Sequence, residues 1–477
     1  MIAANIRSLR QTGAAMTRGD RREPGAGLTT TQLVAFGFPA MTHALIASPV
    51  YAILPTYYAA NTNVTLAEIG TIAAASRIID ALNDPLMGYV SDRYGTRFGH
   101  RKPWMIGAIV FCALAVFQLF SPPSTATWVY FLVWSQVLYT GFTMFEVPRA
   151  AWGAEISRDY QERTRIGVYV GGFNIAGSLS FYLLPIAMGL LIGRSEIDGG
   201  TLSAIAWIYV IAMPIGVLTS MAVVPRGDRV EQKRTRFIDV LRTIARSRPA
   251  QIFFGITMLW GLGQGVVLSC SFIFYTQYMG LGSFYALIMG ALFLTGIIAL
   301  PVWSRILQRV DRHRAWALCI GLPVLLSPIV LLLPRGEAAL IPILCLVVVR
   351  GFLSSPANFL PGAVLSDVID YDTLKSGGNK AGNLFAFQML LIKIAIATGG
   401  AIAFNLLDLA DYNVGGENTP AATTGLLLTY MGIPAVFHLS MAVLAWRFPI
   451  DRRRQGVIQR RLQQRAARGA QEAIAQG

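Results

Sequence analysis

The sequence predicts an all-α membrane protein in which twelve transmembrane helices form two halves of six. Three observations carry this prediction. Hydrophobic residues make up 54% of the 477 residues, and the mean hydropathy is +0.52. Charged residues make up only 14%, whereas soluble domains carry about 25%. Apolar runs long enough to cross a bilayer recur along the chain, and one polar segment separates the first six from the last six.

The apolar runs set the expected boundaries. We expect membrane spans at about 32–56, 67–90, 104–121, 127–150, 166–191, 203–224, 250–275, 284–306, 314–333, 338–362, 383–408 and 422–446. The chain then divides into an N-terminal tail, a first half, a central loop, a second half and a basic C-terminal tail, at residues 1–31, 32–224, 225–249, 250–446 and 447–477. An even number of spans places both tails on one side of the membrane.

The distribution of Lys and Arg predicts the orientation. The formal net charge is +15, and the basic residues gather in both tails and in the loops after the even-numbered spans. The loops on the other side hold only Arg194 and Arg335. Cytoplasmic loops carry the excess of positive charge, so we expect an inner-membrane protein with both termini in the cytoplasm. This placement, with no aromatic residues interleaved, argues against a nucleic-acid partner.

Polar segments at this side are expected to be tails or surface helices. Residues 1–30 have no apolar core of the signal-peptide kind, which indicates a cytoplasmic tail. A segment of the central loop, 237–241, has the pattern of a short surface helix. The C-terminal tail reads as a basic helix that is solvated or faces lipid headgroups.

Enzymatic chemistry has no support in the sequence. The chain shows no pairing of a nucleophile with a base, no metal-ligand cluster and no phosphate-binding loop. Its cysteines fall in apolar spans without a CxxC spacing, which predicts neither disulfides nor a metal site: Cys112, Cys270, Cys319 and Cys345. We therefore expect a protein that is not an enzyme and needs no cofactor.

Charged residues inside the second apolar run give the strongest indication of function. Arg77, Asp80 and Asp84 lie three and four residues apart, which places them on one face of a helix. A charge at the bilayer centre costs roughly 2.5–3.5 kcal/mol even by the lower estimates. We therefore expect this face to line a polar interior, where a cation binds between the two carboxylates. A purely structural Arg–Asp pair is the alternative, but it leaves the second carboxylate without a partner.

The loop after this run contains a recognisable motif. Gly88, Asp92, Arg93 and Arg97 follow the spacing GxxxDRxxxR, which resembles the loop signature of major facilitator transporters. In such a loop the glycine allows helices to approach closely, and the Asp and Arg residues form a cytoplasmic latch that opens and closes. Positive charge that merely sets the orientation is the alternative interpretation.

Two longer blocks in opposite halves resemble one family more closely. The first runs from Arg77 to Trp104, and the second contains Asp367 and Asp370 followed by Gln388 and Lys393. Both resemble the glycoside–pentoside–hexuronide:cation symporter family, over roughly 30–446. The resemblance implies a major facilitator fold and places Asp367 and Asp370 at the cytoplasmic gate.

The resemblance also implies a cation site and a charge-balancing lysine. In the family, residues matching Asp80, Asn83, Asp84 and Thr143 hold the cation. Their oxygens suit Na⁺, and the same carboxylates suit a proton. Lys393 matches a lysine near the aspartates and, with Arg77, is expected to balance their charge when no cation is bound.

Substrate contacts are the part of the resemblance that departs from the family. Glu146 stands where a sugar-binding aspartate is found, but Ala44 and Ala150 replace a second aspartate and a stacking aromatic residue. Candidate replacements are Arg149 and Arg350; Arg350 faces either an anionic substrate group or a buried acid such as Glu146. His43 is a further candidate contact, although a packing role is favoured for it.

Taken together, these features predict a cation-coupled symporter, driven by Na⁺ or H⁺, that imports a small polar solute such as a sugar or glycoside. Transport of a lysophospholipid-like amphiphile or an organic anion is the alternative. A membrane receptor or scaffold that transports nothing is the hypothesis from another class, but it has no need of mid-membrane carboxylates. The expected partners are the solute, the coupling cation and the lipid bilayer, and the expected state is a monomer.

Overall fold

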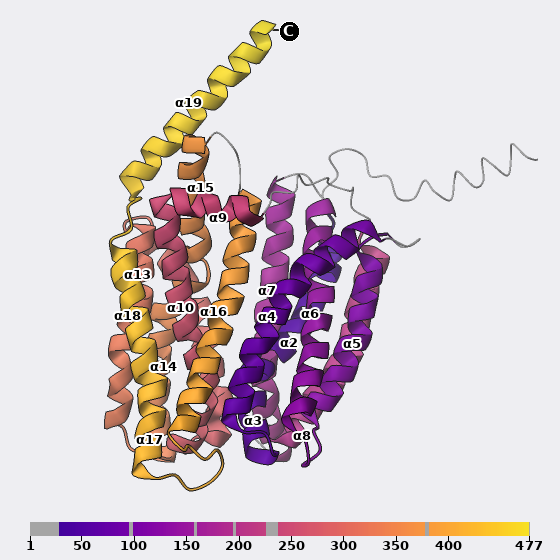
Figure 1. The fold of residues 1–477 in the computed structure, drawn as a ribbon, viewed down its shortest axis with the longest axis vertical. Coiled ribbons are helices and arrows are strands. Elements are labelled where there is room, and N and C mark those ends of the chain that lie inside the picture. Colours follow the sequence, from indigo (N-terminus) through magenta and orange to yellow (C-terminus); the bar gives the residue numbers. More distant parts are fainter. Residues whose placement is uncertain are drawn as a thin grey trace, which may run out of the picture.

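The structure is a computed structural model that describes residues 28–94, 99–156, 160–193, 197–225, 237–376 and 381–476. Its secondary structure is helical throughout these ranges, and the helices form two bundles that stand side by side (Figure 1). Arg97 lies outside the described residues, and for Arg77 only the backbone is described, as part of a helix.

The first bundle contains the helices of the expected spans 1 to 6. They are α2 (Thr30–Ala52) with its short continuation α3 (Leu54–Asn61), α4 (Leu66–Arg93), α5 (Lys102–Phe120), α6 (Trp128–Ile156), α7 (Tyr160–Ile192) and α8 (Gly199–Val223).

The second bundle contains spans 7 to 12, several of which are interrupted. Its elements are α10 (Arg248–Ile273) with the π-helical turn η2 (Phe274–Tyr278), α11 (Tyr285–Ile298), α12 (Leu300–Ile306), α13 (Arg312–Leu326), α14 (Leu340–Ser354), α15 (Leu360–Ser376), α16 (Ala381–Leu409), α17 (Pro420–Leu427), the π-helical turn η7 (Leu428–Gly432) and α18 (Ile433–Trp446). Short 3-10 turns lie between some of them: η3 (Gly282–Phe284), η4 (Ser327–Leu332), η5 (Glu337–Ala339) and η6 (Ser355–Asn358).

The expected surface helices are also present, as α9 (Phe237–Arg246) and α19 (Arg452–Gln476). Figure 1 places both at the same end of the bundles, which we call the α9 end; α3 and α17 mark the opposite end, the α17 end.

Within the described residues, each of the twelve expected spans falls on a helix or on an interrupted pair of helices. Among the described residues, nine helices are long and apolar enough to cross a membrane, or ten if the bent pair α11–α12 is one span. The other two are α4 and α6, with 28 and 29 residues, which are long enough to span but carry the polar residues of the site described below. Each packs against helices that do qualify, α16 and α5 respectively.

Two spans depart most clearly from the expected continuous helices. The span expected at 284–306 bends by 44° between α11 and α12, because Pro301 at the start of α12 cannot continue the hydrogen-bonding ladder. The span expected at 338–362 continues to Ser376, interrupted only by η6, which contains Pro356. Prolines are tolerated within spanning helices because neighbouring groups satisfy the freed backbone carbonyls.

Local capping explains where several helices begin. Thr29 and Thr65 each start a capping box, in which the Thr hydroxyl accepts from the third residue and that residue's Gln or Glu side chain returns the bond. Asp198 caps α8 by accepting from the backbone N–H of Thr201, and Thr419 caps α17 in the same way. Thr29 thus fixes the start of α2 at the α9 end. The other three residues fix the starts of α4, α8 and α17 at the α17 end.

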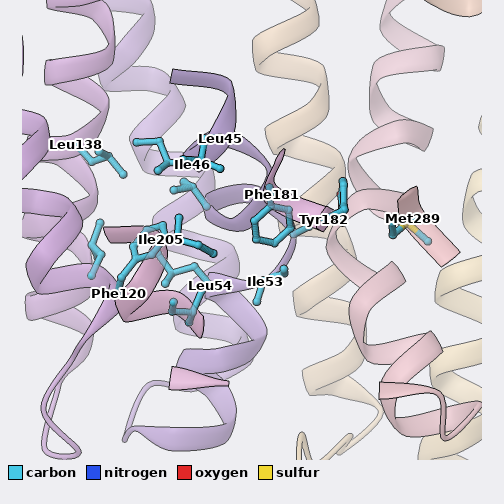
Figure 2. Packing of buried hydrophobic residues seen from close by; sticks show 14 of the residues in the cluster. Leu45, Ile46, Ile53, Leu54, Phe120, Leu138, Phe181, Tyr182, Ile205 and Met289 are labelled. Atoms are coloured by element: carbon cyan, nitrogen blue, oxygen red, sulfur yellow. The ribbon is translucent and has the colours of Figure 1, made fainter. Parts of the chain in front are cut away.

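One of two hydrophobic cores contains residues of both halves, and it lies towards the α17 end. Phe181 and Tyr182 on α7 lie beside Met289 on α11 (Figure 2), and all three are buried. The Tyr182 ring stacks on Phe293 with centroids 5.5 Å apart. At the same end Gly70 of α4 packs so closely against α16 that an added Cβ would lie 3.2 Å from a backbone oxygen of that helix. The halves are thus in firm contact at the α17 end.

The α9 end is organised differently. A second core there is built only from residues of the second half and of the surface helices, including Val240 on α9 and Ile458 on α19. Among the described residues this core contains none of the first half, so the two bundles are packed separately in this part of the α9 end.

Candidate functional site

A cavity of about 910 Å³ lies between the two halves and receives side chains from both. The wall from the first half contributes His43, Asp80, Thr143 and Glu146, among others. The wall from the second half contributes polar and aromatic groups from four different helices and turns: Trp260, Gln264, Arg350, Lys393 and Tyr430. Sequence segments more than 300 residues apart therefore meet at one site.

An ion pair connects the two walls. The ammonium group of Lys393 on α16 lies 3.0 Å from Oδ2 of Asp84 on α4, and 4.0 Å from Oε2 of Glu146 on α6. Lys393 stands 12 residues after the start of α16, which is about 18 Å along the helix. Since both partners come from different halves, this pair holds the halves together at mid-span.

The second carboxylate oxygen of Asp84 is also engaged. The hydroxyl of Thr143 donates to Oδ1 at 2.9 Å, and Thr143 is only 3% exposed. Asp80, one turn earlier on α4, is 5% exposed and lines the cavity. The structure thus places Asp80, Asp84 and Thr143 near one another, with Lys393, the lysine expected near the aspartates, beside Asp84.

Asn83 lies outside this group. Its amide donates to the hydroxyl of Thr140 at 3.3 Å, one turn before Thr143 on α6. Sequence reasoning missed Thr140, although its spacing of three residues from Thr143 puts both hydroxyls on one face of α6. In this structure Asn83 therefore braces α4 against α6.

Glu146 and His43 form a second polar pair on the same wall. Nδ1 of His43 lies 3.7 Å from Oε1 of Glu146, and the imidazole packs against the rings of Phe142 and Phe145 at 4.4 and 5.6 Å. The side chain of Glu146 is 39% exposed and reaches the cavity, so it is accessible to a solute. His43 both packs and lines the cavity, which unites the two roles considered for it.

The two arginines proposed as substrate contacts behave differently. The guanidinium of Arg149 stacks over Phe145 at 5.2 Å, and Arg149 is not among the residues that line the cavity. Arg350 does line the cavity, as Tyr430 does, and among the described residues it forms no ion pair with Glu146. The expectation that Arg149 faces a substrate is thus not met in this conformation.

The α9 end carries a set of ion pairs in which Arg101 takes part and, of the two expected arginines, Arg93 does not; Arg97 lies outside the described residues. Arg101 contacts Asp92 at 2.5 Å and Glu155 at 2.7 Å, and donates to the hydroxyl of Ser91 at 2.9 Å. Arg93, in the last turn of α4, bonds instead to Tyr89, four residues back on its own helix.

Gly88 does not need to be a glycine in this conformation. The nearest atom to an added Cβ is Cγ1 of Val147 at 3.9 Å, an ordinary contact. The expectation of a close helix approach at Gly88 is therefore not met, because the tight approach between α4 and its neighbours is at Gly70.

The acidic pair expected at the second gate has two separate partners. Asp367 accepts from the guanidinium of Arg312 at 2.7 Å, and Asp370 accepts from the amide of Gln455 at 2.6 Å. Arg312 begins α13 and Gln455 belongs to α19, so α15 is tied both to its own bundle and to the C-terminal helix.

The site offers carboxylate and hydroxyl oxygens as ligands, beside the ammonium group of Lys393. Carboxylate and hydroxyl oxygens suit Na⁺, and carboxylates also carry protons. No group of three or more His, Cys, Asp or Glu side chains is gathered to hold a metal ion in the described part of the chain. A cation bound by Asp84 would have to replace the ammonium of Lys393, because both compete for the same oxygen.

Comparisons with known proteins agree with this geometry. The family model described as "MFS/sugar transport protein" matches residues 35–452. The chain is 24% identical to "Putative glycoside/cation symporter YagG" of Escherichia coli (strain K12), covering 84% of this chain and 88% of the relative. It is also 24% identical to "Sodium-dependent lysophosphatidylcholine symporter 1" of Gallus gallus, covering 80% and 79%. The crystal structure of nucleoside transporter NupG superposes with a TM-score of 0.61 at 14% identity, over 88% of this chain and 98% of that one. At such low identity this last match speaks for the fold alone.

Proposed function

The chain belongs to the MFS/sugar transport protein family, and from that premise we propose that it is a cation-coupled symporter that imports a small polar solute by alternating access. The preferred solute is a sugar or glycoside, and the coupling ion is Na⁺ or H⁺. The site residues assigned below belong to this proposal.

One observation carries the coupling mechanism: Lys393 of the second half pairs with Asp84 of the first. In the empty carrier this ammonium neutralises the carboxylate. When a cation binds at Asp80 and Asp84, with the hydroxyl of Thr143 as a further ligand, Lys393 is released. A charged group that loses its partner inside the protein is costly. Cation binding therefore changes the relative stability of the arrangements of the two halves.

Solute binding in the same cavity supplies the second condition for movement. Glu146 accepts hydroxyl hydrogen bonds, and the aromatic rings of Tyr139 and Trp260 on facing walls offer apolar surface to a sugar ring. Glu146 lies 4.0 Å from the ammonium of Lys393, so a solute bound to Glu146 and a cation bound to Asp84 act on the same lysine. Lys393 is thus the proposed link between cation binding and solute binding.

The packing of the halves supports alternating access. They share a core at the α17 end and are packed separately at the α9 end. With the α9 end in the cytoplasm, as the distribution of basic residues indicates, this arrangement corresponds to an inward-facing conformation. The transporter would then be a multi-pass inner-membrane protein with both termini in the cytoplasm, acting as a monomer.

Flux measurements in proteoliposomes test the proposal. Purified protein is reconstituted with an inward Na⁺ or proton gradient, and a panel of sugars, glycosides and lysophospholipids is screened for solute-induced ion uptake. We expect at least one sugar to drive ion flux, and Asp84→Asn to abolish it. A response to lysophospholipids alone would favour the amphiphile alternative, and ion-independent binding without flux would favour a receptor.

A further inference from the structure

Arg350 is a cation deep in the second half. It lies 13 residues after Glu337, the first residue of its span, which is about 20 Å along the helix axis. Tyr430 lines the same cavity, and among the described residues Arg350 forms no ion pair. A charge at this depth normally pairs with a counter-ion or faces a water-filled path. Arg350 lines the central cavity, so a counter-ion would reach it from there.

The backbone around Arg350 is unusual in a way that supports a binding role. Both π-helical turns of the described residues, η2 and η7, lie at this wall of the cavity. The ring of Tyr430 on η7 stacks on Phe274 of η2 with centroids 4.4 Å apart. Such turns are rare and occur mostly at functional sites, because the extra residue redirects the side chains that follow. Here the stacked rings place Tyr430 at the wall of the cavity that also contains Arg350.

The carboxylates of the cavity are assigned elsewhere. Asp84 pairs with Lys393 at 3.0 Å, and Glu146 lies near His43 and Lys393 at 3.7 and 4.0 Å. Asp84 and Glu146 of the first half thus have positive neighbours, whereas the second-half wall carries Lys393 and Arg350 and, among the described lining residues, no acid.

We propose that Arg350 and Tyr430 form an anion-binding subsite, so that the solute carries one anionic group, with its hydroxyls directed to Glu146 on the opposite wall. The shared chemistry is a carboxylate, sulfate or phosphate oxygen that accepts from the guanidinium and from the tyrosine hydroxyl. The inference rests on the proposed symport and narrows its substrate class from sugars in general to sugars bearing one negative charge.

Small anions provide a probe that does not depend on knowing the sugar. The thermal stability of the purified protein is measured in acetate, sulfate or phosphate against chloride at constant ionic strength. We expect at least one of the three to raise Tm, and the one that acts identifies the anionic group. Arg350→Gln should weaken the apparent affinity for that anion about 10- to 100-fold, the effect of losing one charge-assisted hydrogen bond. Tyr430→Phe, which keeps the charge, should weaken it less.

Arg335→Gln serves as the matched control, because Arg335 also stacks on a tyrosine, Tyr278 at 4.2 Å, but does not line the cavity. It should respond to anions as the unaltered protein does. No stabilisation of the unaltered protein by any of the three anions, or an equal response in Arg350→Gln, would overturn the inference. If Arg350→Gln does not fold, the response of the unaltered protein and the loss in Tyr430→Phe still decide.

Transport distinguishes this inference from the proposed function. In proteoliposomes, anionic sugars should drive ion uptake more strongly than neutral sugars of the same ring. Coupled uptake of neutral sugars with no preference for the anionic forms would overturn the anion subsite and leave the symport standing. The absence of coupled uptake for every sugar would overturn the symport itself.

Discussion

The two walls of the central cavity handle charge in opposite ways. On the first half, Asp80, Asp84 and Glu146 are gathered around a single lysine that comes from the other half. On the second half, Arg350 lines the cavity together with Tyr430 of a π-helical turn, and among the described residues it forms no ion pair. From this difference we expect Lys393, which links the halves, to act on cation binding, and Arg350 to act on recognition of the solute. Ion coupling and solute choice are thus expected to respond to different substitutions.

The largest effect should come from the first wall. Asp84→Asn removes the charge that both Lys393 and a coupling cation need, so we expect cation-driven accumulation to fall at least 100-fold while binding of the solute survives. The control variant Asp408→Asn changes an exposed residue near the end of α16, the helix that carries Lys393, and it should transport normally. Uptake assays in proteoliposomes measure both, and uphill uptake that persists in Asp84→Asn would remove this residue from the cation site.

Replacing the lysine tests whether the pair acts as a unit. Lys393→Ala should abolish coupling and lower thermal stability, because it leaves Asp84 without its positive neighbour. Lys393 and Asp84 are partly exposed, at 34% and 23%, so we expect a loss of about 1–3 kcal/mol, less than for a fully buried pair.

The double variant with Asp84→Ala should lose less stability than the sum of the single changes. A thermal-unfolding cycle measures this coupling. Strictly additive losses would show that Lys393 has another role, most directly a contact with the solute.

Two threonines one turn apart separate a cation ligand from a helix brace. Thr143→Val removes the hydroxyl bonded to Asp84, and we expect the apparent cation affinity to fall about 5- to 10-fold, the worth of one hydrogen bond. Thr140→Val removes only the partner of Asn83 and should change cation affinity less than 2-fold. Titration of ion-dependent flux compares the two. The reverse order of effects would make Asn83 and Thr140 the cation ligands.

A smaller effect should distinguish the arginines at the α9 end. The side chain of Arg101 is 12% exposed and contacts two carboxylates, so Arg101→Ala should destabilise this conformation by about 1–3 kcal/mol. Arg93→Ala should change thermal stability by less than about 0.5 kcal/mol, because Arg93 is exposed and bonds only within its own helix. Equal losses in thermal unfolding would assign Arg93 to the latch after all.

Most of the fold follows from simple features of the sequence. Runs of apolar residues and the alternation of basic loops predict the spanning helices and the two halves, because a bilayer requires continuous helices of a set length. The interruptions are harder to foresee. Pro301 marks the bend between α11 and α12, but the π-helical turns at Phe274–Tyr278 and Leu428–Gly432 carry no sequence signal, since they depend on packing between helices.

The site shows the same division. Asp80, Asp84 and Lys393 are recognisable from their mid-span positions and from the family resemblance. Which partner each side chain takes depends on the rotation of neighbouring helices, which no single sequence reports. Asn83 turns to Thr140, Asp92 pairs with Arg101 and not with Arg93, and Arg350 forms no ion pair with Glu146 among the described residues.

Reciprocal titration of ion and solute is the most direct test of the central claim that Asp84 and Lys393 couple them. With the solute found in the flux screen, calorimetry measures solute affinity with and without Na⁺, and Na⁺ affinity with and without solute. We predict that each ligand tightens the other by the same factor, and that the effect disappears in Asp84→Asn. A dependence on pH in place of Na⁺ would identify protons as the coupling ion. Solute binding that is indifferent to both Na⁺ and pH in the unaltered protein would contradict the account.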